Sequence, residues 1–174
     1  MDDELVLRKI ANSVIQTMHE IPELNHLQVE QLHEIPLGFL RKDATRLHAV
    51  CRYRKGIAKS QISGPRDVRC VDVHPVALEN EFRLYAAFLL YHEFLHALGF
   101  TGHDRTFRRL EALWPNTNAT KMGQIFGLHL RRKRFKWLWR CPQCSKEYPR
   151  NRRGNGRYRC RECRVVLMDI PAES

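Results

Sequence analysis

The sequence predicts an α+β protein in which a helix packed on a short sheet precedes a small cysteine-rich module. Apolar residues recur at helical spacing near residue 10 and near residue 90, two segments between them alternate like strands, and two Cys-x-x-Cys pairs lie near the end. A chain of 174 residues, 43% of them hydrophobic, can bury one core and still carry an appendage. We expect a first domain at 1–130, a basic connector at 131–140 and the module at 137–174.

The first half of the chain predicts one helix and two strands. Apolar residues at helical spacing over 4–19 predict an amphipathic helix. Pro22 and Pro36 interrupt the next stretch, which has no clear assignment. Residues 46–54 and 67–74 alternate and predict strands, and Pro75 ends the second. In that strand the inward residues are expected to be Val68, either Cys70 or Val71, and Val73.

The middle of the chain is helical. A long helix is expected at 77–98, with Gly99 as its stop. Because it is apolar nearly all round, it should lie at the centre of its domain. Shorter helices are expected at about 104–113 and 120–135.

The formal net charge of +11 favours a polyanionic partner, although a basic protein without such a partner remains the alternative. From Arg131 to Arg164 the chain has fourteen Lys and Arg residues against Glu147 and Glu162, interleaved with aromatic residues. No apolar run approaches the roughly 20 residues that span a bilayer, and the N-terminus is acidic. We therefore expect a soluble intracellular monomer without a membrane partner, located in the cytoplasm and nucleoid, or in the nucleus of a eukaryote.

The motif His92-Glu93-Phe94-Leu95-His96 is the chemical centre of the sequence. Histidines four residues apart on a helix point to one side, where two neutral imidazoles can bind one Zn²⁺. Glu93 can then act as the general base on a zinc-activated water without binding the metal. A catalytic zinc needs a third ligand, for which we favour His103. The alternatives are Glu111 and Asp104.

Three further expectations concern this motif. Gly102 should let the chain fold back toward the helix, and Asp104 could orient His103 instead of binding metal. An extended peptide substrate could pair with the strand at 68–74. The alternative to a metal site is a buried hydrogen-bond cluster, but two histidines and a glutamate are costly to bury in an apolar helix without a compensating ion.

The cysteine pairs predict a second zinc, of structural type. Cys141 and Cys144 are separated from Cys160 and Cys163 by fifteen residues, which is typical of a four-cysteine zinc ribbon. A redox dithiol would need only one pair. Strands are expected at 137–140, 157–159 and 165–169, whereas the isolated Cys51 and Cys70 are expected to be small buried apolar residues.

The basic C-terminal segment suggests contacts with DNA, single-stranded or damaged. Cations suit phosphate contacts and exposed aromatic rings suit base stacking, although the ribbon could instead simply pack on the first domain. The candidate nucleic-acid-binding residues are Arg131, Arg132, Lys133, Arg134, Lys136, Trp137, Trp139, Arg152, Arg153 and Arg157.

The His92–His96 motif, the following Gly102-His103 with Phe107, and the two cysteine pairs together resemble the SprT-like metalloprotease family, which includes Spartan. The resemblance covers roughly residues 45–170. It implies a small zincin-like domain with its active-site helix against a short sheet, zinc ligands at His92, His96 and His103, and catalysis by Glu93. It also implies cleavage of proteins crosslinked to DNA.

The sequence thus predicts a zinc endopeptidase with two zinc ions per chain, one catalytic and one structural, acting on DNA-bound or DNA-crosslinked proteins. The alternatives are a nucleic-acid-binding zinc protein that keeps the fold without proteolysis, and a general intracellular metalloprotease.

Overall fold

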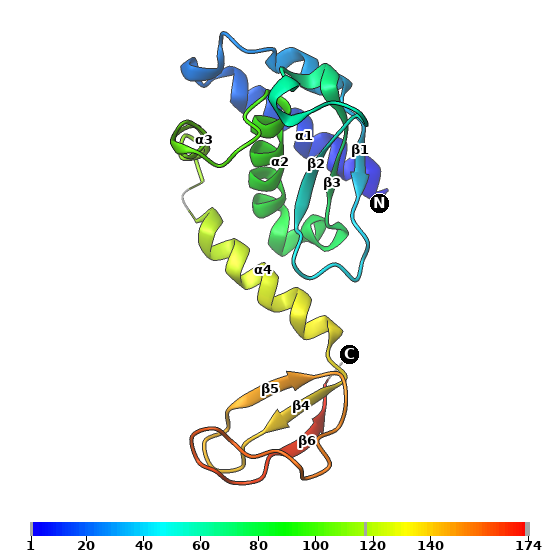
Figure 1. Cartoon of the computed structure of the whole chain (residues 1–174), viewed down its shortest axis with the longest axis vertical. Helices are drawn as coiled ribbons and strands as arrows, with labels where there is room; N and C mark the ends of the chain where they lie inside the picture. The colour runs from blue at the N-terminus through cyan, green and yellow to red at the C-terminus, as the bar shows by residue number, and fades with distance from the viewer. Residues whose placement is uncertain (1, 117, 173–174) are drawn as a thin grey trace. The chain divides into compact units, whose positions relative to one another are not determined.

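The computed structural model describes residues 2–116 and 118–172, without the side chains of Thr120, Lys133 and Arg134. The chain forms two compact units, Met1–Phe126 and Gly127–Ser174, and each is described by itself. The mixed α+β composition expected from the sequence is present (Figure 1).

The first helix, α1 (Asp3–His19), confirms the amphipathic helix expected at 4–19. The carboxylate of Asp2 accepts from the N–H of Glu4 and so caps the helix, and two acidic residues in the first turn suit its positive end. One face of α1 is buried: Val6, Leu7, Ala11, Val14, Ile15 and Met18.

A three-stranded sheet lies beside α1 and α2 (Figure 1). Its strands are β1 (Leu37–Phe39), β2 (Ala49–Tyr53) and β3 (Val68–Val73), in the order β1-β3-β2. The central β3 runs parallel to β1 and antiparallel to β2. Both predicted strands are confirmed. The short β1 was not predicted, and neither were the 3₁₀ turns Pro22–Leu24 and Val29–Glu34 that precede it.

A bulge in β3 decides which of its residues face inward. Arg52 pairs with Cys70 and Tyr53 pairs with Val68, so Arg69 is an extra residue without a partner on β2. The bulge shifts the alternation by one residue. Val68, Val71 and Val73 are therefore the buried residues, while Cys70 is only partly buried.

The central helix α2 (Arg83–Ala97) begins later than the predicted residue 77. The residues before it form two 3₁₀ turns, Pro75–Leu78 and Asn80–Phe82, because Glu79 between them is extended, with ψ 143°. Their apolar side chains are buried as they would be on a helix, which explains why the periodicity appeared continuous. α2 packs against α1, β2 and β3, in agreement with a central position.

Two further helices follow, α3 (Arg105–Glu111) and α4 (Ala119–Arg134), near the predicted positions. Shorter 3₁₀ turns lie at Lys59–Gln61 and Pro65–Asp67. Across the described residues, no helix has both the length and the apolar character needed to cross a bilayer.

The C-terminal unit contains an antiparallel sheet of β4 (Trp137–Arg140), β5 (Glu147–Arg150) and β6 (Met168–Pro171), in the order β5-β4-β6. β4 matches its prediction. β5 was not predicted, and the strand expected at 157–159 is reduced to a single bridge between Arg159 and Val166. The strand expected at 165–169 starts later, at Met168, because Val165 closes the turn after the second cysteine pair.

Candidate metal centres

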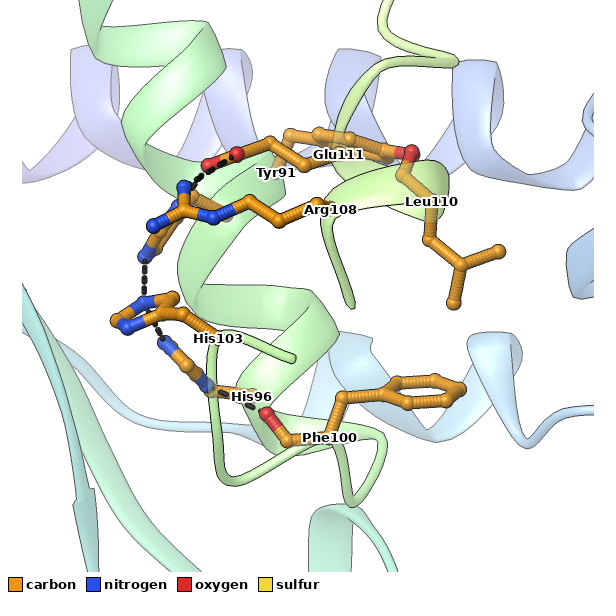
Figure 2. A network of polar contacts seen from close by, with 8 residues as sticks. Tyr91, His96, Phe100, His103, Arg108, Leu110 and Glu111 are labelled. Carbon is orange, nitrogen blue, oxygen red and sulfur yellow. Dashed lines mark hydrogen bonds and ion pairs between the residues drawn. The ribbon is translucent and has the colours of Figure 1, made fainter. Parts of the chain in front are cut away.

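Three imidazoles meet at the C-terminal end of α2. The Nε2 atom of His103 lies 3.1 Å from Nε2 of His92 and 3.1 Å from Nε2 of His96. Figure 2 shows the rings of His96 and His103 turned toward each other. His92 and His96 come from successive turns of the helix, and His103 comes from the loop that follows it.

Gly99 allows the chain to reverse after α2. It is the residue after the C-cap, with φ 105°, and its N–H donates to the carbonyl of His96. The N–H of Phe100 donates to the carbonyl of Leu95, which completes a Schellman motif. The sequence prediction gave this role to Gly102, but Gly102 has no positive φ and an added Cβ there would meet nothing within 4 Å.

The Nδ1 atoms of His92 and His96 point away from the cluster and form hydrogen bonds to oxygen atoms. Nδ1 of His92 lies 2.6 Å from Oε1 of Glu111, and Nδ1 of His96 lies 2.6 Å from the carbonyl oxygen of Phe100. Both acceptors require a proton on Nδ1, so the Nε2 atoms carry lone pairs. Glu111, an alternative third ligand in the sequence analysis, therefore lies behind His92 and not beside Nε2.

Asp104 is a helix cap and neither a ligand nor a partner of His103. Its carboxylate accepts from the N–H of Phe107 at 2.9 Å, as an N-cap residue of α3. The sequence gave Asp104 two other roles because it considered only the distance along the chain to His103. The cap instead sets where α3 starts.

The cluster fits a zinc ion. Nitrogen ligands ~2.0–2.1 Å from a tetrahedral zinc are about 3.3–3.4 Å apart, close to the 3.1 Å found here. Burial lowers the pKa of His96 to about 4 and also lowers the pKa of His92, so both rings are neutral at pH 7. The lone pairs on Nε2 of His92 and His96 face the same point as Nε2 of His103, where a cation would bind them.

Residues outside the motif hold the cluster, and the sequence analysis missed all but one of them. The ring of Phe107 lies 4.6–4.9 Å from each of the three imidazoles, measured between ring centroids. The hydroxyl of Tyr53 on β2 donates to the carbonyl of His96 at 3.0 Å, and that of Tyr91 donates to the carbonyl of Leu110 at 2.5 Å. These contacts tie α2 to β2 and α3. Only Phe107 had been noted, as part of the resemblance.

Glu93, which follows His92 in the sequence, is buried, with 7% of its surface exposed. Its Oε2 accepts from the N–H of Cys51 on β2 at 2.7 Å. Burial raises the pKa of the Glu93 carboxyl to about 7, and the Cys51 N–H opposes this shift. No cation of the described residues forms an ion pair with this carboxyl, and burying a carboxyl in that state is costly, which is typical of a group that serves in chemistry.

The thiol of Cys51 is inert. It is buried, and burial together with the Glu93 charge raises its pKa to about 12. Cys70 is partly buried, so the expectation of two buried residues holds for Cys51 alone.

The four predicted cysteines of the C-terminal unit also meet. The sulfur atoms of Cys141, Cys144, Cys160 and Cys163 all lie within 4.8 Å of one another. Cys144 and Cys160 are 3.7 Å apart between their Sγ atoms, against about 3.8 Å for two thiolates ~2.3 Å from a tetrahedral zinc. The cluster thus fits a structural zinc.

The two cysteine pairs are built alike. In the first, the carbonyl of Cys141 accepts from the N–H of Ser145, and its own N–H donates to Lys146. In the second, Cys160 has the same two bonds, with Arg164 and Val165. Ser145 and Arg164 both have positive φ, 58° and 62°, so each pair closes with the same left-handed turn. This repeat presents both pairs of sulfurs to one ion.

Two of the predicted nucleic-acid-binding residues have structural roles instead. Trp139 is 4% exposed, packs on Cys141, Cys160 and Leu167, and donates from its indole N–H to the carbonyl of Arg152, so it cannot stack on a base. The ring of Trp137 is partly buried under the guanidinium of Arg153, 4.2 Å from its centroid.

The remaining candidates are exposed where the structure describes them. These are Arg131, Arg132, Lys136, Arg152, Arg153 and Arg157, while the side chains of Lys133 and Arg134 lie outside the described residues. The sequence analysis missed Tyr158, which is 39% exposed and stacks on Trp139 with 4.1 Å between ring centroids. Among the described aromatic residues of this unit it is the most accessible.

Residues 135–168 match the model of the SprT-like zinc ribbon domain. The match covers the four cysteines and all of β4 and β5, and it begins well after the histidine cluster, which therefore lies outside it. No curated protein and no solved structure shows significant similarity to the chain. The C-terminal unit therefore contains a SprT-like zinc ribbon.

Proposed function

We propose that the chain is a zinc-dependent endopeptidase that acts on proteins bound or crosslinked to DNA. The convergence of three Nε2 atoms, together with the burial of Glu93, the residue that follows His92 in the sequence, carries the proposal. The ribbon supports it, because SprT-type zinc ribbons are associated with zinc metalloproteases.

Each residue of the cluster would have a separate task. His92, His96 and His103 would hold the zinc, which lowers the pKa of water to about 7 and polarises a carbonyl oxygen. Glu93 would take the proton from the attacking water and return it to the leaving amine. Its Oε2 is fixed by the N–H of Cys51, which leaves Oε1 for this proton transfer.

The strand that could hold a peptide substrate is β2, not the strand at 68–74 suggested by the sequence. β3 is central and paired on both sides, whereas β2 lies at the edge of the sheet. The backbone groups of His48 point toward β3, because its carbonyl accepts from the N–H of His74. Residues alternate along an antiparallel strand, so Cys51, three positions later, points its N–H away from β3, toward the free edge of the sheet. An extended peptide added along this edge would lie beside Glu93.

Association with DNA rests on the charge of the ribbon unit. Its exposed cations greatly outnumber the described acidic residues Glu147, Glu162 and Asp169, and the exposed ring of Tyr158 offers a stacking surface. A general protease would share the histidine cluster but would not need this surface.

Added single-stranded DNA should therefore raise the rate of cleavage of a DNA-binding protein by about tenfold or more, because the protease and its substrate would bind the same DNA strand. Salt should weaken the effect. The logarithm of the DNA-binding constant should fall linearly with the logarithm of the salt concentration, with a slope of ~0.7 for each phosphate contact. The measurement is the cleavage rate with and without DNA at several salt concentrations. Reversal of Arg153 and Arg157 to Glu should remove most of the stimulation, while the same change at Lys59 and Arg66, exposed in the other unit, should not.

A cleavage rate that does not respond to DNA would favour a general protease. Absence of cleavage under all conditions, together with tight DNA binding, would favour a non-proteolytic DNA-binding protein.

A further inference from the structure

The contacts of Glu111 form a chain that ends at the histidine cluster. Oε1 of Glu111 lies 2.6 Å from Nδ1 of His92, and its Oε2 accepts from Nη1 of Arg108 at 2.8 Å. Figure 2 shows Arg108 and Glu111 side by side above the cluster. The carboxylate is largely buried, with 17% of the side chain exposed.

We propose that Glu111 is a positioning residue, which holds His92 as the Nδ1–H tautomer and aims its Nε2 at the metal. An imidazole binds a metal only through a nitrogen without a proton, and the acceptor on the other nitrogen selects that form. Arg108 supports this role because its hydrogen bond fixes the rotamer of the Glu111 carboxylate. The inference rests on the proposed metal role of the cluster and adds a residue that sets how tightly the metal is held.

His96 has an equivalent acceptor, but from the backbone. Its Nδ1 faces the carbonyl of Phe100, which the Schellman turn after α2 places there. A backbone acceptor cannot be removed by substitution. Of these two ligands, His92 is thus the one whose orientation depends on a single side chain.

The charge of Glu111 should matter as well as its hydrogen bond. Three neutral imidazoles supply no negative charge to a divalent cation, so an anion behind His92 makes that ring a stronger donor. Arg108 weakens this effect only in part, because its side chain is 59% exposed and therefore screened by water. Two substitutions can separate the contributions: Gln keeps an acceptor without the charge, and Ala removes both.

Zinc affinity at the histidine cluster should fall about 10–100-fold in Glu111→Ala and by a smaller factor in Glu111→Gln. Arg108→Ala should have a still smaller effect. The experiment takes the full chain with one zinc already in the ribbon and titrates a second equivalent against a competing chelator. Co²⁺ in place of the second zinc gives an absorption band that reports tetrahedral nitrogen coordination. Glu34→Gln, an exposed glutamate on the same unit, is the matched control.

The outcomes are distinct. If the wild type binds a second zinc and Glu111→Ala binds it equally well, Glu111 has no positioning role, while the proposed function stands. If the wild type binds no second zinc, the proposed function fails. Should Glu111→Ala not fold, Glu111→Gln decides, since it fits the same space: unchanged affinity and an unchanged Co²⁺ band would overturn the proposal.

Discussion

Glu93→Gln should lower the rate of peptide cleavage by about 10²–10⁴-fold, the range expected when a general base is removed. Glutamine has nearly the same shape as glutamate but cannot take up the proton. Its side-chain oxygen can still accept from the N–H of Cys51, so the link between α2 and β2 should persist. The zinc content should not change, because Glu93 does not belong to the group of ligand atoms.

The measurement is the cleavage rate of a peptide substrate, taken together with zinc per chain and the thermal unfolding temperature. The neutral amide is less costly to bury than a carboxylate, so the variant should be at least as stable as the wild type. A variant that is folded, holds zinc and cleaves at the wild-type rate would exclude Glu93 as the base.

Cys160→Ser should unfold the ribbon. A unit of this size buries too little apolar surface to fold alone, and a structural zinc contributes about 10–16 kcal/mol in comparable small domains. The N–H of Cys163, followed by the Tyr148 hydroxyl, lowers the pKa of the Cys160 thiol to about 6, which favours the thiolate that zinc binds. Serine cannot replace this ligand at neutral pH.

Hydrogen exchange measures this effect unit by unit. Amides of β4 and β5 should lose protection in Cys160→Ser, whereas those of α2 should keep it, and DNA affinity should fall. The matched control is Cys70→Ser, which removes a thiol outside both metal clusters and should leave the ribbon intact. Protection that persists in β4 without the fourth thiolate would show that the ribbon folds without its metal.

The sequence predicted the residues of the histidine cluster better than the residues that support it. Ligands close together in the chain can be deduced from helical spacing and a short loop, as for His92, His96 and His103, which the structure brings together. The position of Glu111 depends on how α3 packs against α2, a tertiary contact that no local pattern contains. Gly99 was correctly predicted to stop the helix, but the reversal of the chain was assigned to Gly102, because only the fold shows that Gly99 is the one of the two with a positive φ.

In the two sheets as well, the features that depend on tertiary contacts could not be predicted from local sequence patterns. β1 has three residues, too few for a recognisable alternation, and it is placed by pairing with β3. In β4 the alternation puts Trp137 and Trp139 on one face, but only the packing of Tyr158 and Cys160 shows that Trp139 belongs to the core. The sequence prediction chose candidate DNA-binding residues by residue type alone. It therefore included Trp139, which is buried, and omitted Tyr158, which is exposed.

The number of zinc ions per chain tests the central claim most directly. Metal analysis of the purified wild type should give two, and His96→Ala should give one, because it removes a nitrogen from the histidine cluster and leaves the four cysteines untouched. One zinc in the wild type, with none lost in His96→Ala, would show that the cysteine cluster alone binds metal. The three imidazoles would then be a hydrogen-bonded cluster, and the proposed peptidase would have no catalytic centre.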